Sequence, residues 1–188
     1  MNNRLLFIDT ETGGVEPTEC SLFSIGLIVW ENGSIIFEDE VYVKDVVYKV
    51  TAQALKINNI DISQIDESGL DKRSVIEKLK RIKKEYFNNI IMTVAGHNVG
   101  FDISFLKQLY KDSNDNFLDD FSHRAIDTSS ILQFLYFSEK LEKYISSSDD
   151  AFQYFNIGVE KRHTALDDCR ATVSLFNKLI SLEKADEG

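Results

Sequence analysis

Two acidic residues close a short apolar stretch near the start of the chain, within LLFIDTETGG (Leu5–Gly14). On a β-strand, Asp9 and Glu11 would face the same side of the sheet, while Thr10 between them would face the other. Paired carboxylates are ligands for Mg²⁺ or Mn²⁺, whereas zinc prefers nitrogen and sulfur. The two glycines that follow permit a sharp turn and the close approach of a ligand. Taken alone, the stretch fits a metal site and an ordinary solvent-exposed strand end equally well.

A second group of polar residues lies in AGHNVGFDISFL (Ala95–Leu106). Asp102 falls early in an expected helix, where a carboxylate suits the helix dipole without any ligand. For a lone aspartate this structural reading usually holds, but the apolar neighbours of Asp102 make a functional reason worth seeking. His97 and Asn98 precede it at the expected end of a strand, and ligands of α/β sheets gather where strands lead into helices.

A third group lies in KRHTALDDCRATVSLF (Lys161–Phe176) and contains two adjacent aspartates. Thr164 suits the N-cap of a helix and places Asp167 at its third position, the pattern of a capping box. Asp168 is rotated by ~100° from Asp167 and can therefore face a site. His163 precedes the helix and is a candidate proton acceptor, because a hydrolase needs a base beside metal-bound water. A lone histidine is nevertheless more often an ordinary surface or core residue.

The elements that must position these residues form an α/β pattern, with strands clustered early and then alternating with helices. Strands are predicted over Leu5–Thr10, Ser21–Trp30, Ser34–Val43, Asn89–Asn98 and His123–Thr128. Helices are predicted over Thr51–Asp61, Arg73–Phe87, Val99–Tyr110 and Thr164–Leu182, with a polar loop over Lys111–Ser122. The pair Asn32-Gly33 predicts a hairpin, so the sheet is mixed. The last helix is expected to bury Leu166, Cys169, Val173, Phe176 and Ile180.

The composition is that of a globular protein, with 188 residues, 43% of them hydrophobic and 28% charged. We expect one domain spanning residues 1–188. The N-terminal apolar run is too short for a signal peptide or a membrane span, which favours a cytoplasmic protein without membrane association. The two cysteines, Cys20 and Cys169, lack a CxxC spacing and are expected to be ordinary thiols. A net charge of −10 argues against a protein that coats nucleic acid, although not against a metal-dependent enzyme that grips a few nucleotides.

Together, the three motifs resemble the DEDDh (DnaQ-like) 3′–5′ exonucleases, whose pattern is Asp-x-Glu, His-Asn-x-x-x-Asp and His-x-x-x-x-Asp in this order. The chain carries them as FIDTETGG, HNVGFD and HTALDD. AIDTSSIL (Ala125–Leu132) is similar to a further segment of the family. The resemblance extends from about residue 4 to residue 180.

This resemblance implies a ribonuclease H-like mixed β-sheet flanked by α-helices, with two divalent ions, Mg²⁺ or Mn²⁺, at four acids. By resemblance, Asp9 would bridge both ions, and Glu11 and Asp168 would complete one of them. Asp102 would hold the other ion directly or through water. His163 would take a proton from the attacking water, as a general base.

The resemblance also implies the substrate, which is the 3′ end of single-stranded DNA or RNA, and the product, a nucleoside 5′-monophosphate. It extends less firmly to a contact of the terminal nucleotide with the backbone of Thr12 and Gly13, and to a substrate role for His97 or Asn98. Nothing in the residues separates DNA from RNA. The basic run Lys78–Lys84 is favoured as a solvated helix face over a nucleic-acid track.

Several alternatives stay open at this point. The chain shows no long extension after its last helix, which favours a stand-alone trimming exonuclease over a stably bound proofreading subunit. Association with a DNA polymerase and a homodimer both remain open. Oligoribonuclease-like degradation of short RNA is a second enzymatic hypothesis. A non-catalytic nucleic-acid or polymerase-binding module is a third hypothesis, of a different class.

Overall fold

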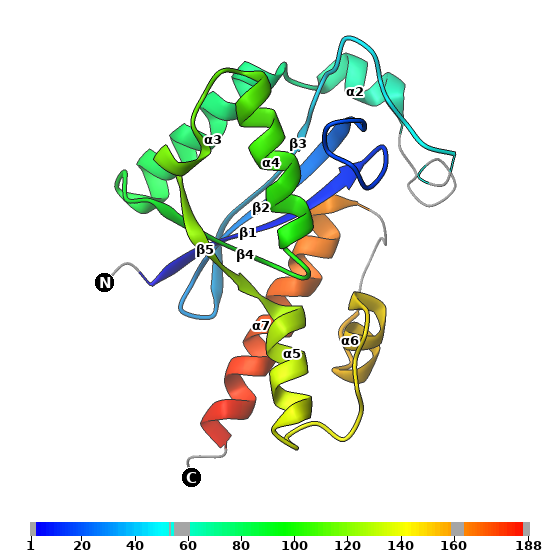
Figure 1. Ribbon diagram of the computed structural model, residues 1–188. Helices are drawn as coiled ribbons and strands as arrows, with labels where there is room; N and C mark the ends of the chain where they lie inside the picture. The colour runs from blue at the N-terminus through cyan, green and yellow to red at the C-terminus, as the bar shows by residue number, and fades with distance from the viewer. Residues whose placement is uncertain (1–2, 53, 55–60, 159–163, 186–188) are drawn as a thin grey trace.

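The computed structural model describes residues 3–52, 54, 61–158 and 164–185. In this part of the chain, a five-stranded sheet has the order β3-β2-β1-β4-β5 (Figure 1). Its strands are β1 (Arg4–Thr12), β2 (Leu22–Glu31), β3 (Ser34–Tyr42), β4 (Met92–Gly96) and β5 (Phe121–Asp127). The first three strands are antiparallel neighbours, whereas β1, β4 and β5 run parallel. The predicted mixed sheet is therefore confirmed, with β1 at its centre.

The hairpin between β2 and β3 turns at the two residues that predicted it. Asn32 and Gly33 have φ angles of 51° and 93°. A two-residue turn with positive φ at both positions matches the twist of antiparallel strands. Because this turn makes β2 and β3 antiparallel, it helps to set the register of the sheet.

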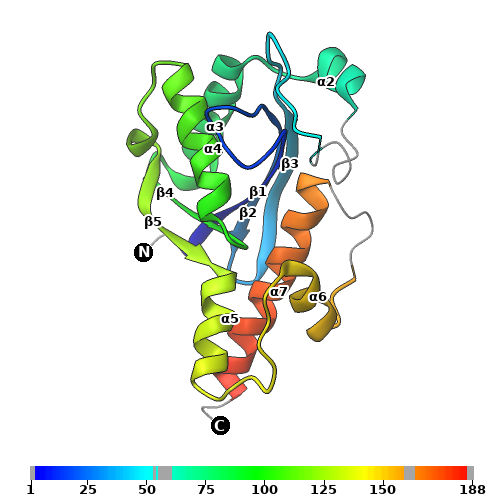
Figure 2. The ribbon, with the colours of Figure 1, turned by 45° about the vertical axis from the view of Figure 1, so that its right-hand side comes forward.

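Helices cover both faces of the sheet, with α3 and α4 on one face and α7 on the other (Figures 1 and 2). The helices are α2 (Ile62–Ser68), α3 (Lys72–Phe87), α4 (Gly100–Asp112), α5 (Thr128–Phe137), α6 (Ser148–Tyr154) and α7 (Ala165–Ala185). A short 3₁₀ helix, η1 (Phe117–Asp119), follows α4. The helix predicted over Thr51–Asp61 lies mostly outside the described residues. Within the part of the chain that the structure describes, no helix has the length and apolarity to cross a membrane.

Strand β1 is buried on both faces, as its apolar sequence predicted. Leu6 and Ile8 pack into the core beneath α3 and α4. Phe7 packs on the opposite face against Cys169 and Val173 of α7. A strand held from both sides is a rigid support for the acidic residues at its end.

Helix α7 packs on two sides, of which the sequence predicted one. The predicted stripe packs against the sheet and comprises Leu166, Cys169, Val173, Phe176 and Ile180. A second stripe, with Ala171, Leu175 and Leu179, packs against residues of α5 and α6. Packing on two sides fixes the position of α7, and hence of the aspartates in its first turn.

The segment Lys111–Ser122, predicted as a polar loop, contains a 3₁₀ helix and the start of a strand. It forms η1, and β5 begins at Phe121 rather than at His123. Phe117 and Phe121 stack on each other and are buried in the core beside Tyr110. The loop prediction was wrong here because the free energy gained by burying these aromatic side chains exceeds the conformational entropy lost when their polar neighbours become ordered.

The basic run on α3 makes ion pairs with neighbouring elements. Lys78 pairs with Asp39 of β3, and Lys83 pairs with the buried Asp120 that precedes β5. Lys80 pairs with Asp115 between α4 and η1. These contacts give the run a structural role in fastening α3 to the sheet.

Candidate metal centre

Three acidic residues from two distant parts of the chain converge at the end of β1. Ligand oxygens of Asp9, Glu11 and Asp168 all lie within 4.8 Å of one another. The three side chains are half-buried, so a ligand has access to them. Like charges at such separations repel unless a cation lies between them. Their hard oxygen donors could hold a divalent cation.

The register of the sheet places Asp9 and Glu11 together. Asp9 pairs with Gly26 and Glu11 pairs with Ser24, so both acids lie opposite β2. The parallel register with β4 extends only to Phe7, which leaves the acids beyond the paired part of β4. The register with β2 then shifts between Glu11 and Thr12. The site therefore lies at the carboxyl end of the central strand, where α/β sheets commonly bind ligands.

The first turn of α7 separates the two adjacent aspartates. The backbone N–H of Asp167 donates to Thr164 Oγ1 at 3.2 Å, and the Thr164 hydroxyl donates to the Asp167 carboxylate at 2.9 Å. Arg170 binds the same carboxylate at 2.7 Å and forms a second, two-pronged pair with Glu38 of β3. The predicted N-cap role of Thr164 is confirmed, and Asp167 supports it by accepting a hydrogen bond from the Thr164 hydroxyl. Asp168 is the aspartate that reaches the acidic cluster.

The start of α7 lies directly against the backbone of β2. A Cβ atom on Gly26 would lie only 2.2 Å from the carbonyl oxygen of Ala165, the first residue of the helix. Glu40 of β3 accepts hydrogen bonds from the Ala165 N–H and from Ser24 Oγ, the latter at 3.1 Å. Neither Gly26 nor Glu40 was predicted from the sequence to belong to the site. A glycine inside an apolar strand was the available signal, because it often marks the close approach of another backbone.

The fourth acid, Asp102, lies beside the cluster without belonging to the three-residue group. It is 4% exposed, and Thr10 Oγ1 donates to its Oδ1 at 2.7 Å. Burial raises the pKa of Asp102 to about 7, against the hydrogen bond from Thr10, which lowers it. The pKa of the Cys169 thiol is raised by burial and then by the charges of Asp9, Asp102 and Asp168. Asp9, Asp102 and Asp168 therefore all lie near the buried thiol, which is held in its protonated form.

His97 and Asn98 form the corner between β4 and α4, held by the start of α5. The Thr128 hydroxyl donates to the carbonyl of Gly96 at 3.1 Å, so its oxygen accepts from His97 Nδ1 at 3.0 Å. Burial lowers the pKa of His97, which favours a neutral ring with Nε2 as an acceptor. Asn98 has a left-handed backbone with φ of 55°, and its N–H donates to Asp127 at 2.8 Å. The AIDT segment therefore fixes this corner.

Thr12 and Gly13 lie at a junction of two loops. The Gly13 N–H donates to Ser21 O at 2.8 Å, and the Gly13 carbonyl accepts from the Thr51 N–H at 2.7 Å. A Cβ on Gly13 would lie 2.0 Å from Lys49 O, so no other residue fits there. The N–H of Gly13 is therefore already hydrogen-bonded within the protein. Gly13 is itself buried, and its contact with a nucleotide stays a prediction.

The predicted general base lies outside the described residues. His163 falls in the segment 159–163, which also contains Lys161 and Arg162. Its predicted role stays a prediction. Thr164 follows it directly and caps α7, the helix that carries Asp168.

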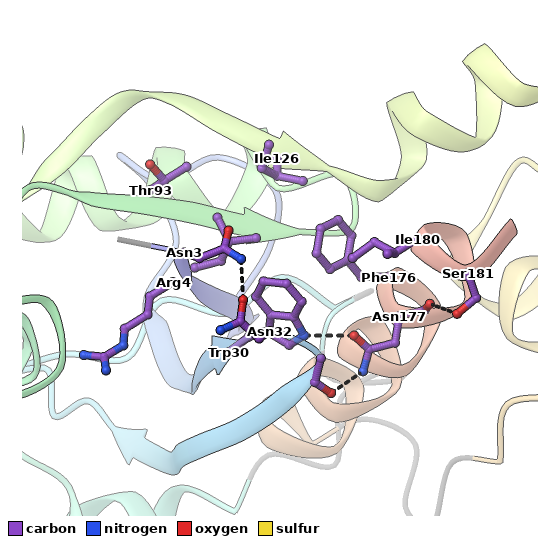
Figure 3. Close-up of a pocket in the computed structure, with 12 residues that line it drawn as sticks. Asn3, Arg4, Trp30, Asn32, Thr93, Ile126, Phe176, Asn177, Ile180 and Ser181 are labelled. Atoms are coloured by element: carbon purple, nitrogen blue, oxygen red, sulfur yellow. Dashed lines mark hydrogen bonds between the residues drawn. The ribbon is translucent and has the colours of Figure 1, made fainter. Parts of the chain in front are cut away.

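A cavity of about 700 Å³ lies at the other end of β1, away from the acids (Figure 3). Its wall includes Arg4, Trp30 and Phe176. Trp30 Nε1 donates to Asn177 Oδ1 at 2.9 Å, and Asn177 Nδ2 donates to Gly33 O at 3.0 Å. These polar groups hold α7 to the β2–β3 hairpin, and none of the four acids lines the cavity.

Replacement of Asp167 by alanine tests its capping role. We expect Asp167→Ala to lower the free energy of unfolding by about 0.5–2 kcal/mol, because the helix loses a partner of its N-cap. The stabilisation by Mn²⁺, measured as a shift in melting temperature, should be unchanged, because Asp168 reaches the cluster and Asp167 does not. Loss of that shift in Asp167→Ala would reverse the roles of the two aspartates.

Replacement of Glu40 by glutamine tests how α7 is held at low and neutral pH. Burial raises the pKa of Glu40, so the folded protein holds this proton more tightly than the unfolded chain does. The resulting stabilisation is present at acidic pH and is lost as the pH rises above the ordinary value of 4.5. We therefore expect the melting temperature of Glu40→Gln, relative to that of the wild type, to rise as the pH increases. The control is Glu19→Gln at an exposed position. If the difference in melting temperature between Glu40→Gln and the wild type depends on pH no more than that of the control, the expectation is contradicted.

Comparison with known proteins identifies a family. A family model described as Exonuclease (RNase_T) matches residues 6–176. The PolC-type DNA polymerase III of Thermotoga petrophila is 27% identical over 184 residues, which cover 97% of this chain and 12% of that protein. The corresponding polymerase of Caldanaerobacter subterraneus is 24% identical over 187 residues, again 12% of its length. The chain thus spans only a small part of these curated relatives.

Solved structures share the fold at low sequence identity. Escherichia coli exonuclease I in complex with a dA16 oligonucleotide matches with a TM-score of 0.81 and 17% identity, over 97% of this chain and 42% of that one. The nuclease domain of 3′hExo, a DEDDh family member bound to rAMP, matches with a TM-score of 0.76 and 14% identity, over 96% and 92% of the two chains. The mixed sheet with its flanking helices is the ribonuclease H-like fold predicted from the sequence. With three motifs, this fold and a family match over most of its length, the chain belongs to the exonuclease family of the DEDDh (DnaQ-like) type.

Proposed function

We propose that this protein is a metal-dependent 3′–5′ exonuclease acting on single-stranded DNA or RNA. It would hydrolyse the phosphodiester bond at the 3′ end and release nucleoside 5′-monophosphates. The observation that carries the proposal is the convergence of Asp9, Glu11 and Asp168 within 4.8 Å at the end of the central strand. These acids come from two motifs that are far apart in the sequence, with Asp9 and Asp168 separated by 159 positions, and folding brings them together.

The four acids would hold two divalent cations, Mg²⁺ or Mn²⁺. Asp9, Glu11 and Asp168 supply one group of oxygens, and the buried Asp102 supplies a further carboxylate beside them. When bound, two such ions stabilise the attacking and leaving oxygens of an in-line displacement. The chain itself contributes rigidity, because β1 is buried on both faces and α7 is packed on two sides.

His163 is our proposed general base, and it would take a proton from the attacking water. It directly precedes the N-cap of the helix that carries Asp168. The neutral ring of His97, whose Nδ1 is held by Thr128, would offer Nε2 to the terminal nucleotide. Asn98 and the backbone around Thr12 and Gly13 would complete the substrate contacts.

The relatives favour association with a DNA polymerase as a second aspect of this function. The matched curated proteins are PolC-type DNA polymerases III, in which the matching part is a small fraction of the whole. A polymerase-associated exonuclease that removes nucleotides from a primer end would use the same site. Stand-alone trimming and a homodimer stay predictions.

One experiment separates the main hypotheses. The protein is offered matched DNA and RNA oligonucleotides, labelled at either end, with Mg²⁺ or Mn²⁺, and products are followed over time. We expect 5′-labelled strands to shorten stepwise and 3′-labelled strands to release labelled 5′-mononucleotides at once. Immediate release of mononucleotides from the 5′ label would overturn the polarity. No hydrolysis of any strand at saturating Mn²⁺ would support the non-catalytic module instead.

A second comparison tests oligoribonuclease-like activity. A labelled RNA dinucleotide and a long single strand are compared at equal concentrations of 3′ ends. The general exonuclease predicts comparable rates or faster cleavage of the long strand, because additional nucleotides contribute stacking contacts. A strong preference for the dinucleotide would favour degradation of short RNA.

A further inference from the structure

Thr10 makes a contact that its place between two acids does not reveal. Its side chain faces away from Asp9 and Glu11, on the side of the sheet covered by α3 and α4, and it is 8% exposed. There its hydroxyl donates to Asp102 Oδ1 at 2.7 Å, across 92 residues of sequence. One residue therefore links the first acidic motif to the second.

The carboxylate of Asp102 is held tightly in this position. It is 4% exposed and accepts hydrogen bonds from the hydroxyl of Thr10, from the backbone N–H of Thr10 and from its own N–H. Of these donors, the hydroxyl is the only one that a substitution can remove without changing the backbone. Thr10 is also adjacent to Asp9 in the sequence. A displacement of Thr10 or Asp102 would therefore change the positions of the acids in the cluster.

We propose that Thr10 is a positioning residue for the metal centre, which fixes the orientation of Asp102 beside Asp9, Glu11 and Asp168. The inference rests on the proposed metal-dependent function. Residues that hydrogen-bond to metal ligands fix the ligand rotamer, and their loss commonly weakens metal binding. Without the Thr10 hydroxyl, the Asp102 carboxylate loses one of its donors and can rotate away from the cation.

A purely structural role for this bond is the competing explanation, in which it only fastens α4 to β1. The two explanations differ in metal binding. A fastening bond affects the melting temperature in EDTA and leaves the affinity for the metal unchanged. A positioning bond affects the affinity for the metal beyond any change in the metal-free protein.

The test measures Mn²⁺ binding to the full chain by calorimetry, without nucleic acid, together with melting temperatures in EDTA. Thr10→Val removes the hydroxyl at nearly constant volume, Thr10→Ser retains it, and Thr93→Val on β4 is the matched control that lines the distant cavity. We expect Thr10→Val to weaken the affinity of at least one Mn²⁺ ion by ~10-fold, the lower end of the range for such partners. Thr10→Ser and Thr93→Val should bind Mn²⁺ as the wild type does.

Wild-type Mn²⁺ affinity in folded Thr10→Val would overturn the positioning role and leave the proposed function intact. Equal weakening in Thr10→Val and Thr10→Ser would also overturn it, because the hydroxyl would then be irrelevant. Should Thr10→Val not fold, Thr10→Ala provides the same comparison without added bulk. Failure of the wild type to bind Mn²⁺ would overturn the proposed metal centre itself.

Discussion

Replacing Asp168 by asparagine is expected to abolish hydrolysis of single-stranded oligonucleotides while the protein stays folded. Its oxygen lies within 4.8 Å of those of Asp9 and Glu11, where the three acids would share a cation. Metal ions supply several kcal/mol of charge stabilisation in the transition state, and 1.36 kcal/mol is tenfold in rate. We therefore expect a loss of about 1000-fold in kcat, measured with a 5′-labelled strand. Asp9→Asn should behave in the same way.

The metal-free stability of these variants provides an independent reading. Three carboxylates at this separation repel one another, so removing one charge should raise the melting temperature in EDTA or leave it unchanged. Addition of Mn²⁺ should stabilise the wild type strongly and Asp168→Asn weakly, because ligand binding stabilises by mass action. The two measurements together separate loss of the metal from loss of the fold.

Asp167 is the matched control, since it differs from Asp168 by one position and carries the same charge. Asp167→Asn removes the negative charge that pairs with Arg170, retains an oxygen that can accept from the Thr164 hydroxyl, and removes no oxygen of the cluster. It should retain hydrolysis within a few-fold of the wild type. Wild-type turnover in Asp168→Asn, together with inactivity of Asp167→Asn, would refute the arrangement of the site.

The sequence predicted those features of the site that depend on local periodicity. Alternation along a strand placed Asp9 and Glu11 on one side, and the capping pattern separated Asp167 from Asp168. Both outcomes depend only on residues close in the sequence, and the structure agrees with them. The central buried strand and the sheet-facing stripe of α7 were predictable for the same reason.

The features that escaped prediction are contacts between distant residues. Thr10 meets Asp102 across 92 residues, and Arg170 meets Glu38 across 132 residues. Nothing in the local pattern of either residue specifies its partner, because the pairing follows from the packing of whole elements. The same holds for Glu40, whose carboxylate reaches the first N–H of α7 from an antiparallel strand.

Gly26 provides the second large expected effect. We expect Gly26→Ala to disrupt the metal centre from β2 without touching any acid. The new Cβ would lie 2.2 Å from the carbonyl oxygen of Ala165 and 2.4 Å from its carbon, and neither backbone atom can rotate away. The first turn of α7 must therefore shift, and Asp168 lies only three residues further along. A displacement of ~1 Å at a catalytic group can reduce the rate by ~100-fold.

The expected result has two parts. Overpacking should lower the free energy of unfolding by about 1–3 kcal/mol. At a temperature well below the melting transition, where the variant is folded, kcat should still be reduced by ~100-fold and Mn²⁺ stabilisation should be diminished. The persistence of the defect in the folded variant distinguishes displacement of Asp168 from simple instability.

Gly100→Ala is the matched control for the chemical change. A Cβ at Gly100, in the first turn of α4, meets no atom within 4 Å. This variant should be at least as stable as the wild type, because alanine restricts the unfolded chain, and it should bind Mn²⁺ normally. Wild-type turnover in folded Gly26→Ala would show that α7 can move against β2 without consequence. If Gly26→Ala instead shows reduced kcat and Mn²⁺ stabilisation, the metal centre requires a glycine at this position. Gly26 lies on β2 opposite Asp9, and only a glycine there lets the first turn of α7 bring Asp168 close to the strand.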